Sequence, residues 1–136
     1  MSWTHFPHEA DIGLRGSGPD KASAFAAIGL ALTAVVTDPE HVAATDAVQI
    51  RCEAPNDETL LFDWLNALIY EMAVGKLLFR QFDVRIDGIS LSAEVRGEPV
   101  DLTKHEPAVE VKGATYTEIR VDETDEGWMT QCIVDV

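Results

Sequence analysis

The sequence has few cysteines, few basic residues and no long apolar run, and each shortage argues against a class of protein. Its two cysteines, Cys52 and Cys132, form no CxxC pair, which disfavours a zinc site and favours buried structural thiols. No run of about 18 apolar residues occurs, so we expect no membrane span. The first eleven residues show neither the basic nor the apolar stretch of a signal peptide, so we expect a cytoplasmic protein.

The shortage of basic residues bears on possible partners. Lysine and arginine together number 10 against 24 aspartates and glutamates, a formal net charge of −14. A protein that grips nucleic acid unaided normally neutralises phosphates with basic side chains, so this composition argues against direct RNA or DNA binding. The acidity suits a basic protein partner or divalent cations, and it equally suits a simple adaptation to solvent.

The length and apolar content predict one domain over residues 1–136. The chain is 46% hydrophobic, enough for one core in a domain of this size. Residues 20–36 predict a helix whose buried stripe contains Phe25, Ile28, Leu32 and Val35. Residues 57–74 predict a second helix, with Asn56 or Asp57 as its N-cap.

The rest of the chain alternates apolar and polar residues as strands do. Asp87-Gly88 and residues 125–127 predict tight turns. The order of elements and the many hairpins predict an α+β layered sandwich, in which two main helices pack over a mixed, mostly antiparallel sheet. The expected strands are residues 3–6, 12–15, 47–54, 78–86, 89–98, 109–123 and 128–136.

Three carboxylates stand at the ends of expected elements: Asp11, Asp38 and Asp135. A carboxylate buried there is costly unless a cation pairs with it. A divalent cation could bind all three, with the C-terminal carboxylate of Val136 as a further oxygen donor. The alternatives are ordinary: a turn at Asp11, a helix end at Asp38 and a solvated terminus at Asp135. Spacing alone does not choose between these interpretations.

Other candidate residues are weaker. His8 has no second histidine at zinc-ligand spacing and is more typical of a hydrogen-bonded turn. We find no GxSxG motif and no glycine-rich phosphate loop. Lys112 is a lone lysine in an expected strand, either a functional cation or a charge that protects a sheet edge, and the residues by themselves favour the second.

Five segments in order resemble the archease family over nearly the whole chain. No single segment is decisive, but the ordered set is specific. Glu9 and Gly113 depart from the family pattern, which usually has threonine and alanine there. The segments are FPHEADIGLRGSG at 6–18, TD at 37–38, LLFDWLNALIYEM at 60–72, GEPVDLTKHEPAVEVKGATY at 97–116 and IVDV at 133–136 after Trp128.

The resemblance implies a function that the residues alone do not. Archeases are small acidic proteins that assist RtcB-type RNA ligases, which join RNA ends in tRNA splicing and RNA repair with GTP and a divalent metal. We therefore expect a non-enzymatic activator that promotes ligase guanylylation and multiple turnover, and that meets RNA only through the ligase. The alternatives are a metal-dependent hydrolase of a small phosphorylated substrate and a chaperone or interaction module.

The resemblance also implies site residues. The family's metal ligands correspond to Asp11, Asp38 and Asp135, and the Val136 carboxylate lies next to the last of them. Ca²⁺ is the expected cation, with Mg²⁺ or Mn²⁺ as alternatives. Lys112 matches a lysine of the family motif, so a part in ligase activation is expected for it, with no specific role assigned.

Overall fold

The computed structural model describes residues 1–136 and contains eight strands, three α-helices and one 3-10 turn. None of the helices combines the length and the hydropathy that crossing a membrane requires. In chain order the elements are β1 (Ser2–His8), β2 (Asp11–Gly18), α1 (Lys21–Val36), the 3-10 turn η1 (Pro39–His41), β3 (Asp46–Glu53), α2 (Asp57–Ala73), β4 (Leu77–Asp87), β5 (Ser90–Pro99), α3 (Leu102–His105), β6 (Gly113–Ala114), β7 (Arg120–Thr124) and β8 (Gly127–Asp135).

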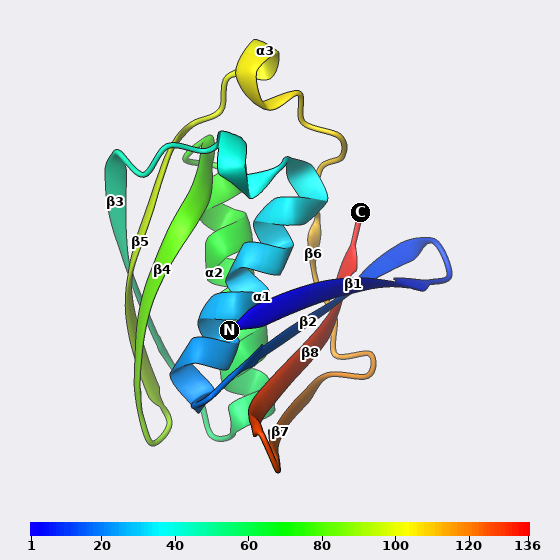
Figure 1. The fold of residues 1–136 in the computed structure, drawn as a ribbon, viewed down its shortest axis with the longest axis vertical. Helices are drawn as coiled ribbons and strands as arrows, with labels where there is room; N and C mark the ends of the chain where they lie inside the picture. The colour runs from blue at the N-terminus through cyan, green and yellow to red at the C-terminus, as the bar shows by residue number, and fades with distance from the viewer.

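The strands form two sheets, and the two long helices lie between them (Figure 1). One sheet has the order β1-β2-β8-β6, with β7 also paired to β8, and the other has the order β3-β5-β4. The α+β layered class is confirmed. The structure differs from the expected single mixed sheet because β3 pairs with the β4–β5 hairpin instead of joining β2 and β8, and every strand pair is antiparallel.

Helix α1 is buried around most of its circumference, whereas the sequence predicts a single apolar stripe. Phe25 and Ile28 of that stripe are buried, and so are the small residues Ala24 and Ala27. Gly16 of β2 lies so close to α1 that a Cβ atom there would come 2.4 Å from the backbone nitrogen of Ile28. A helix that is apolar on most sides needs a cover on each of them, and the two sheets provide it.

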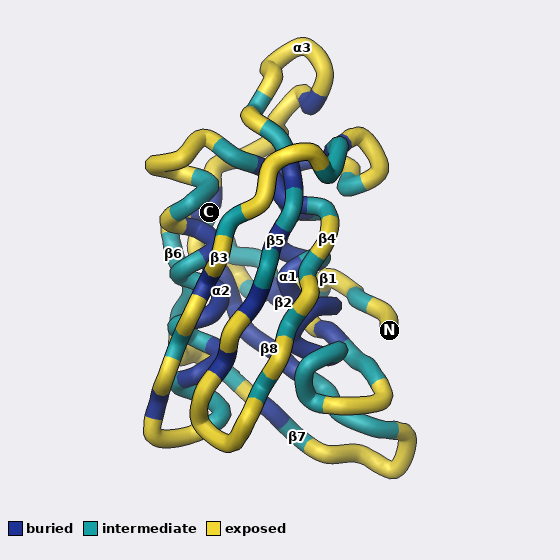
Figure 2. The backbone as a smooth tube through the Cα atoms, turned by 90° about the vertical axis from the view of Figure 1, so that its left-hand side faces the viewer, coloured by how far each residue is buried: buried dark blue, intermediate teal, exposed yellow.

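One hydrophobic cluster of 25 buried residues joins both helices to both sheets. Trp64 of α2 is fully buried, and its indole nitrogen donates to the carbonyl of Phe25 on α1 at 3.0 Å. Along β5, buried and more exposed residues alternate, so one face of the three-stranded sheet packs on the helices and the other meets solvent (Figure 2). Both sheets therefore pack on the two helices.

The prediction of buried structural cysteines holds for Cys132 and only in part for Cys52. Cys132 is buried in β8 and Cys52 is half-buried in β3, and neither forms a disulfide. Burial raises the pKa of the Cys132 thiol to about 11. A thiol with so high a pKa is protonated near neutral pH and is a poor nucleophile.

The segment 109–123 is not the single strand that the sequence predicts. Residues 109–112 form no strand, β6 contains only two residues, and β7 begins at Arg120. The turn between β6 and β7 contains Glu118 with a φ of 53°, a left-handed backbone conformation that a strand does not tolerate. The short elements η1 and α3 were also not predicted; Asp38 and Asp101 are their N-caps.

Candidate metal-binding site

Asp11 and Asp135 stand at the adjacent ends of β2 and β8. These strands pair antiparallel, and the last pair is Ile12 opposite Val134, so Asp11 and Asp135 are the residues next to that pair on each strand. Asp11 is half-buried and Asp135 is exposed. Two of the three candidate ligands therefore lie at the same end of the β2–β8 pair, in the middle of the five-stranded sheet.

Asp38 lies directly beyond the end of α1, where its carboxylate caps η1. Its Oδ1 accepts the backbone N–H of Glu40 at 3.0 Å, and its Oδ2 lies 4.0 Å from Nε2 of His41. The side chain is 56% exposed. Asp38 thus has the ordinary capping role that the sequence left open, and its second oxygen faces only an exposed histidine.

The segment between α3 and β6 links the end of α1 to the end of β8. The backbone N–H of Ala108 donates to the carbonyl of Val36 at 2.9 Å, and that of Lys112 donates to the carbonyl of Asp135 at 2.8 Å. The end of α1, which precedes Asp38, and the end of β8, which contains Asp135, are therefore both hydrogen-bonded to the same short segment, residues 108–112.

The carboxylates do not form a ready metal cluster. No group of three or more histidine, cysteine, aspartate or glutamate side chains lies close enough to hold a metal ion. Because Asp38 and Asp135 are exposed, no burial cost requires a cation beside them, contrary to the physical reason first given for the site. The donor chemistry still fits a hard divalent cation, since Asp11, Asp135 and the Val136 terminus all offer oxygen ligands at one end of the β2–β8 pair.

Lys112 is exposed at the start of β6, an edge of the five-stranded sheet. Its backbone is held by Asp135, but its ammonium group forms no ion pair or hydrogen bond within the chain. The sequence predicted Lys112 inside a strand, whereas it directly precedes β6. An exposed and unpaired cation can contact a partner or an anionic ligand.

The β1–β2 turn holds the remaining candidates of the N-terminal segment. Nε2 of His8 lies 3.1 Å from a carboxylate oxygen of Glu118, and its Nδ1 is buried without a partner. His8 therefore lies at a strand end with a carboxylate as the neighbour of one ring nitrogen. Glu9 is exposed in the two-residue turn between His8 and Asp11, with a φ of 55°.

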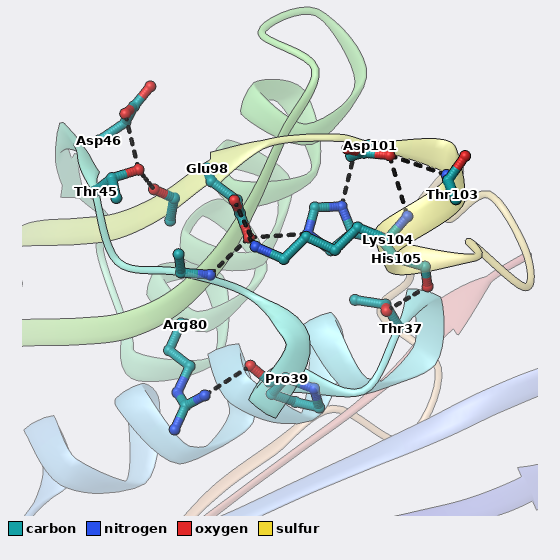
Figure 3. A network of polar contacts seen from close by, with 12 residues as sticks. Thr37, Pro39, Thr45, Asp46, Arg80, Glu98, Asp101, Thr103, Lys104 and His105 are labelled. Atoms are coloured by element: carbon teal, nitrogen blue, oxygen red, sulfur yellow. Dashed lines mark hydrogen bonds and ion pairs between the residues drawn. The ribbon is translucent and has the colours of Figure 1, made fainter.

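A polar network next to Asp38 in the chain was not predicted from the sequence (Figure 3). Oε2 of Glu98 accepts from the backbone N–H of Ala43 at 2.7 Å and from Nζ of Lys104 at 2.7 Å, and it lies 3.0 Å from Nε2 of His105. Nδ1 of His105 accepts the backbone N–H of Asp101 at 2.9 Å, so the ring proton lies on Nε2, toward Glu98. We call Thr37, Ala43, Glu98, Asp101, Lys104 and His105 the Glu98 network.

The Glu98 network gives a testable pH dependence. Lys104, the Ala43 N–H and His105 together lower the pKa of Glu98 from 4.5 to about 2. A lowered folded-state pKa stabilises the fold above the unfolded value, and the stabilisation is lost as pH falls. We expect the difference in unfolding free energy between the wild type and Glu98→Gln to be constant above pH 4.5 and to shrink between pH 4.5 and about 2. Urea unfolding at a series of pH values measures it, and a difference that does not change with pH would contradict the assignment.

Comparisons with known proteins identify the family. The profile of the archease protein family (MTH1598/TM1083) matches residues 3–136. The archease of Pyrococcus abyssi (strain GE5 / Orsay) is 35% identical over 139 residues and that of Pyrococcus furiosus 36% over 139 residues, each alignment covering 98% of both chains.

Solved structures agree with the sequence relatives. The solution structure of Methanobacterium thermoautotrophicum protein 1598 superposes with a TM-score of 0.81 at 26% identity, covering 98% of each chain. The crystal structure of a Thermotoga maritima archease, titled a possible chaperone, has a TM-score of 0.59 at 18% identity and covers 96% of this chain and 94% of that one. The second likeness concerns the fold alone. On the profile match and the sequence relatives together, the chain belongs to the archease family.

Proposed function

We propose that this protein is a non-enzymatic, cytoplasmic activator of an RtcB-type RNA ligase, acting in tRNA splicing or RNA repair. It promotes guanylylation of the ligase and keeps the ligase turning over. Membership of the archease family along residues 3–136 is the observation that carries this proposal. The position of Asp11 and Asp135 at the same end of the β2–β8 pair supports the accompanying metal site.

Within this proposal, Asp11, Asp135, Asp38 and the Val136 carboxylate hold one divalent cation, Ca²⁺ in the first place and Mg²⁺ or Mn²⁺ otherwise. When bound, the cation supplies positive charge that offsets the charge of nucleotide phosphates. Asp38 joins the set by turning its carboxylate away from the Glu40 N–H that it accepts in the structure. The backbone of Lys112 is hydrogen-bonded to Asp135, and its free ammonium supplies a second positive charge.

The charge of the chain supports a protein partner over RNA. With 24 acidic and 10 basic residues, the surface attracts a basic protein and repels phosphate backbones. The activator therefore contacts the ligase directly, and RNA only through the ligase.

A multiple-turnover RNA-joining assay tests the proposal. With RNA in excess over a cognate RtcB-type ligase and with GTP, wild-type protein should let the ligated product exceed the ligase concentration. Lys112→Met should lower that yield. Lys76→Met is the matched control, because Lys76 is also exposed and unpaired, and it should leave the yield unchanged. A yield that wild-type protein leaves unchanged would contradict the proposal. Phosphatase activity that survives purification and is lost in Asp11→Ala would favour the hydrolase instead.

A chaperone role is the second candidate, because the surface has an apolar hollow of about 330 Å³ under the 100–111 segment. Tyr70, Val74, Leu102 and Val109 add large exposed apolar side chains on α2, α3 and that segment. Exposed apolar patches are typical of surfaces that bind other chains. If this role is the main one, wild type and Asp135→Asn should suppress the aggregation of an unfolded client equally well.

A further inference from the structure

The Glu98 network ties together four segments that meet beyond the end of α1. These are the end of α1 through Thr37, the loop before β3 through Ala43, the end of β5 through Glu98, and α3 through His105. Each contact joins residues far apart in the sequence, except those within residues 98–105. The network therefore sets how the 100–112 segment lies against α1.

The network is well satisfied and buried at its centre. The His105 side chain has no exposed surface, and that of Glu98 is 16% exposed. Both nitrogens of His105 are engaged, and one oxygen of Glu98 has three partners. Because buried polar groups are costly when unpaired, loss of one partner favours a rearrangement of the segment over a small local adjustment.

The polypeptide chain leads from the network to the candidate site by two routes. The Thr37 hydroxyl donates to the carbonyl of His105 at 2.6 Å, and Asp38 is the next residue along the chain. From His105 the chain continues to Ala108, whose backbone is hydrogen-bonded to Val36. It then reaches Lys112, whose backbone is hydrogen-bonded to Asp135. The same network thus adjoins Asp38 on one side and leads to Lys112 on the other.

We propose that Thr37, Glu98 and His105 are positioning residues that hold the segments carrying Asp38 and Lys112 near the end of the β2–β8 pair, where Asp11 and Asp135 lie. They contact neither the cation nor the ligase and act only through these two segments. The role of Asp38 and Lys112 rests on the proposed function. The position of their segments does not depend on that function, so it can be tested without metal or ligase.

Hydrogen exchange on the isolated protein gives that first test. Thr37→Val removes the hydroxyl that bonds His105 and keeps the side-chain shape, whereas Thr37→Ser keeps the hydroxyl. We expect the Ala108 and Lys112 amides to exchange at least about tenfold faster in Thr37→Val and Glu98→Gln, because local opening exposes them. The same amides in Thr37→Ser and the core amides of α2 in every variant should exchange as in the wild type. Unchanged exchange at Ala108 and Lys112, or an equal rise throughout the chain, would overturn the proposal.

A calorimetric titration with Ca²⁺ gives the second test. Residues that orient metal ligands typically contribute about 10- to 100-fold to affinity, so Thr37→Val should lose that much and Thr37→Ser should lose little. If the wild type binds Ca²⁺ and Thr37→Val binds it equally tightly, the positioning proposal is wrong. If the wild type binds no divalent cation, the metal site of the proposed function is wrong, and hydrogen exchange still decides the positioning.

Discussion

Replacing Asp135 by asparagine is expected to weaken divalent-cation binding by about 10- to 100-fold, because the number of charged oxygen ligands largely sets the affinity of such sites. Asp135 is exposed and is held through its backbone carbonyl, which accepts the Lys112 N–H, so the fold should survive the substitution, with a stability change within about 0.5 kcal/mol. Calorimetric titration with Ca²⁺, and then with Mg²⁺ and Mn²⁺, measures the loss.

Asp125→Asn is the matched control for this experiment. It removes the same charge from the exposed β7–β8 turn, at the opposite end of β8. A general effect of net charge would weaken binding equally in both variants. Equal affinity of the wild type and Asp135→Asn would remove Asp135 from the ligand set.

The second large effect is expected in the core. Trp64→Ala should destabilise the protein by about 3–5 kcal/mol, the range for deleting a buried aromatic side chain. Trp64 is fully buried, bonds the Phe25 carbonyl and meets the Phe82 ring edge-on with centroids 6.3 Å apart. Since small domains unfold at a cost of about 5–15 kcal/mol, this variant should be close to unfolding.

Urea unfolding followed by far-UV circular dichroism measures the loss without relying on tryptophan fluorescence. Trp64→Phe is the control, because it keeps an aromatic ring and mainly removes the hydrogen bond to Phe25. It should cost clearly less than the alanine variant, about 1–3 kcal/mol for the lost hydrogen bond and the smaller ring. A loss below about 1 kcal/mol in Trp64→Ala would contradict the central place of Trp64 in the core.

The elements with strong local patterns were predictable from the sequence. The helix expected at 57–74 is α2 at Asp57–Ala73, with Asn56 as its N-cap, because a cap followed by a periodic apolar face is a local signal. The β4–β5 hairpin was also found, although its two-residue turn is Gly88-Ile89, with Gly88 at a φ of 61°. Local backbone preferences decide such features.

The layer arrangement was not predictable in the same way. The apolar periodicity of α1 shows that a face is buried, but not that sheets cover it from two sides. Which strands pair depends on contacts between distant segments, such as β2 with β8. The expected strand at 109–123 failed because its alternating pattern does not reveal the left-handed turn at Glu118.

The candidate site likewise combines residues that the sequence identified with an arrangement that it did not. The resemblance selected Asp11, Asp38 and Asp135, and only the strand register shows that Asp11 and Asp135 lie at the same end of one strand pair. Glu98 and His105 belong to the family-like segment 97–116, but the sequence assigned them no role. No sequence pattern shows that these polar side chains are buried together. Family membership is confirmed, whereas the metal, the ligase and the role of Lys112 stay predictions.

Single-turnover guanylylation of a cognate RtcB-type ligase with GTP tests the central claim most directly. The wild-type protein should accelerate this step, and Asp11→Ala, Asp38→Ala and Asp135→Ala should each fail to do so while remaining folded. A ligase that is guanylylated at the same rate with and without the wild-type protein would contradict the account.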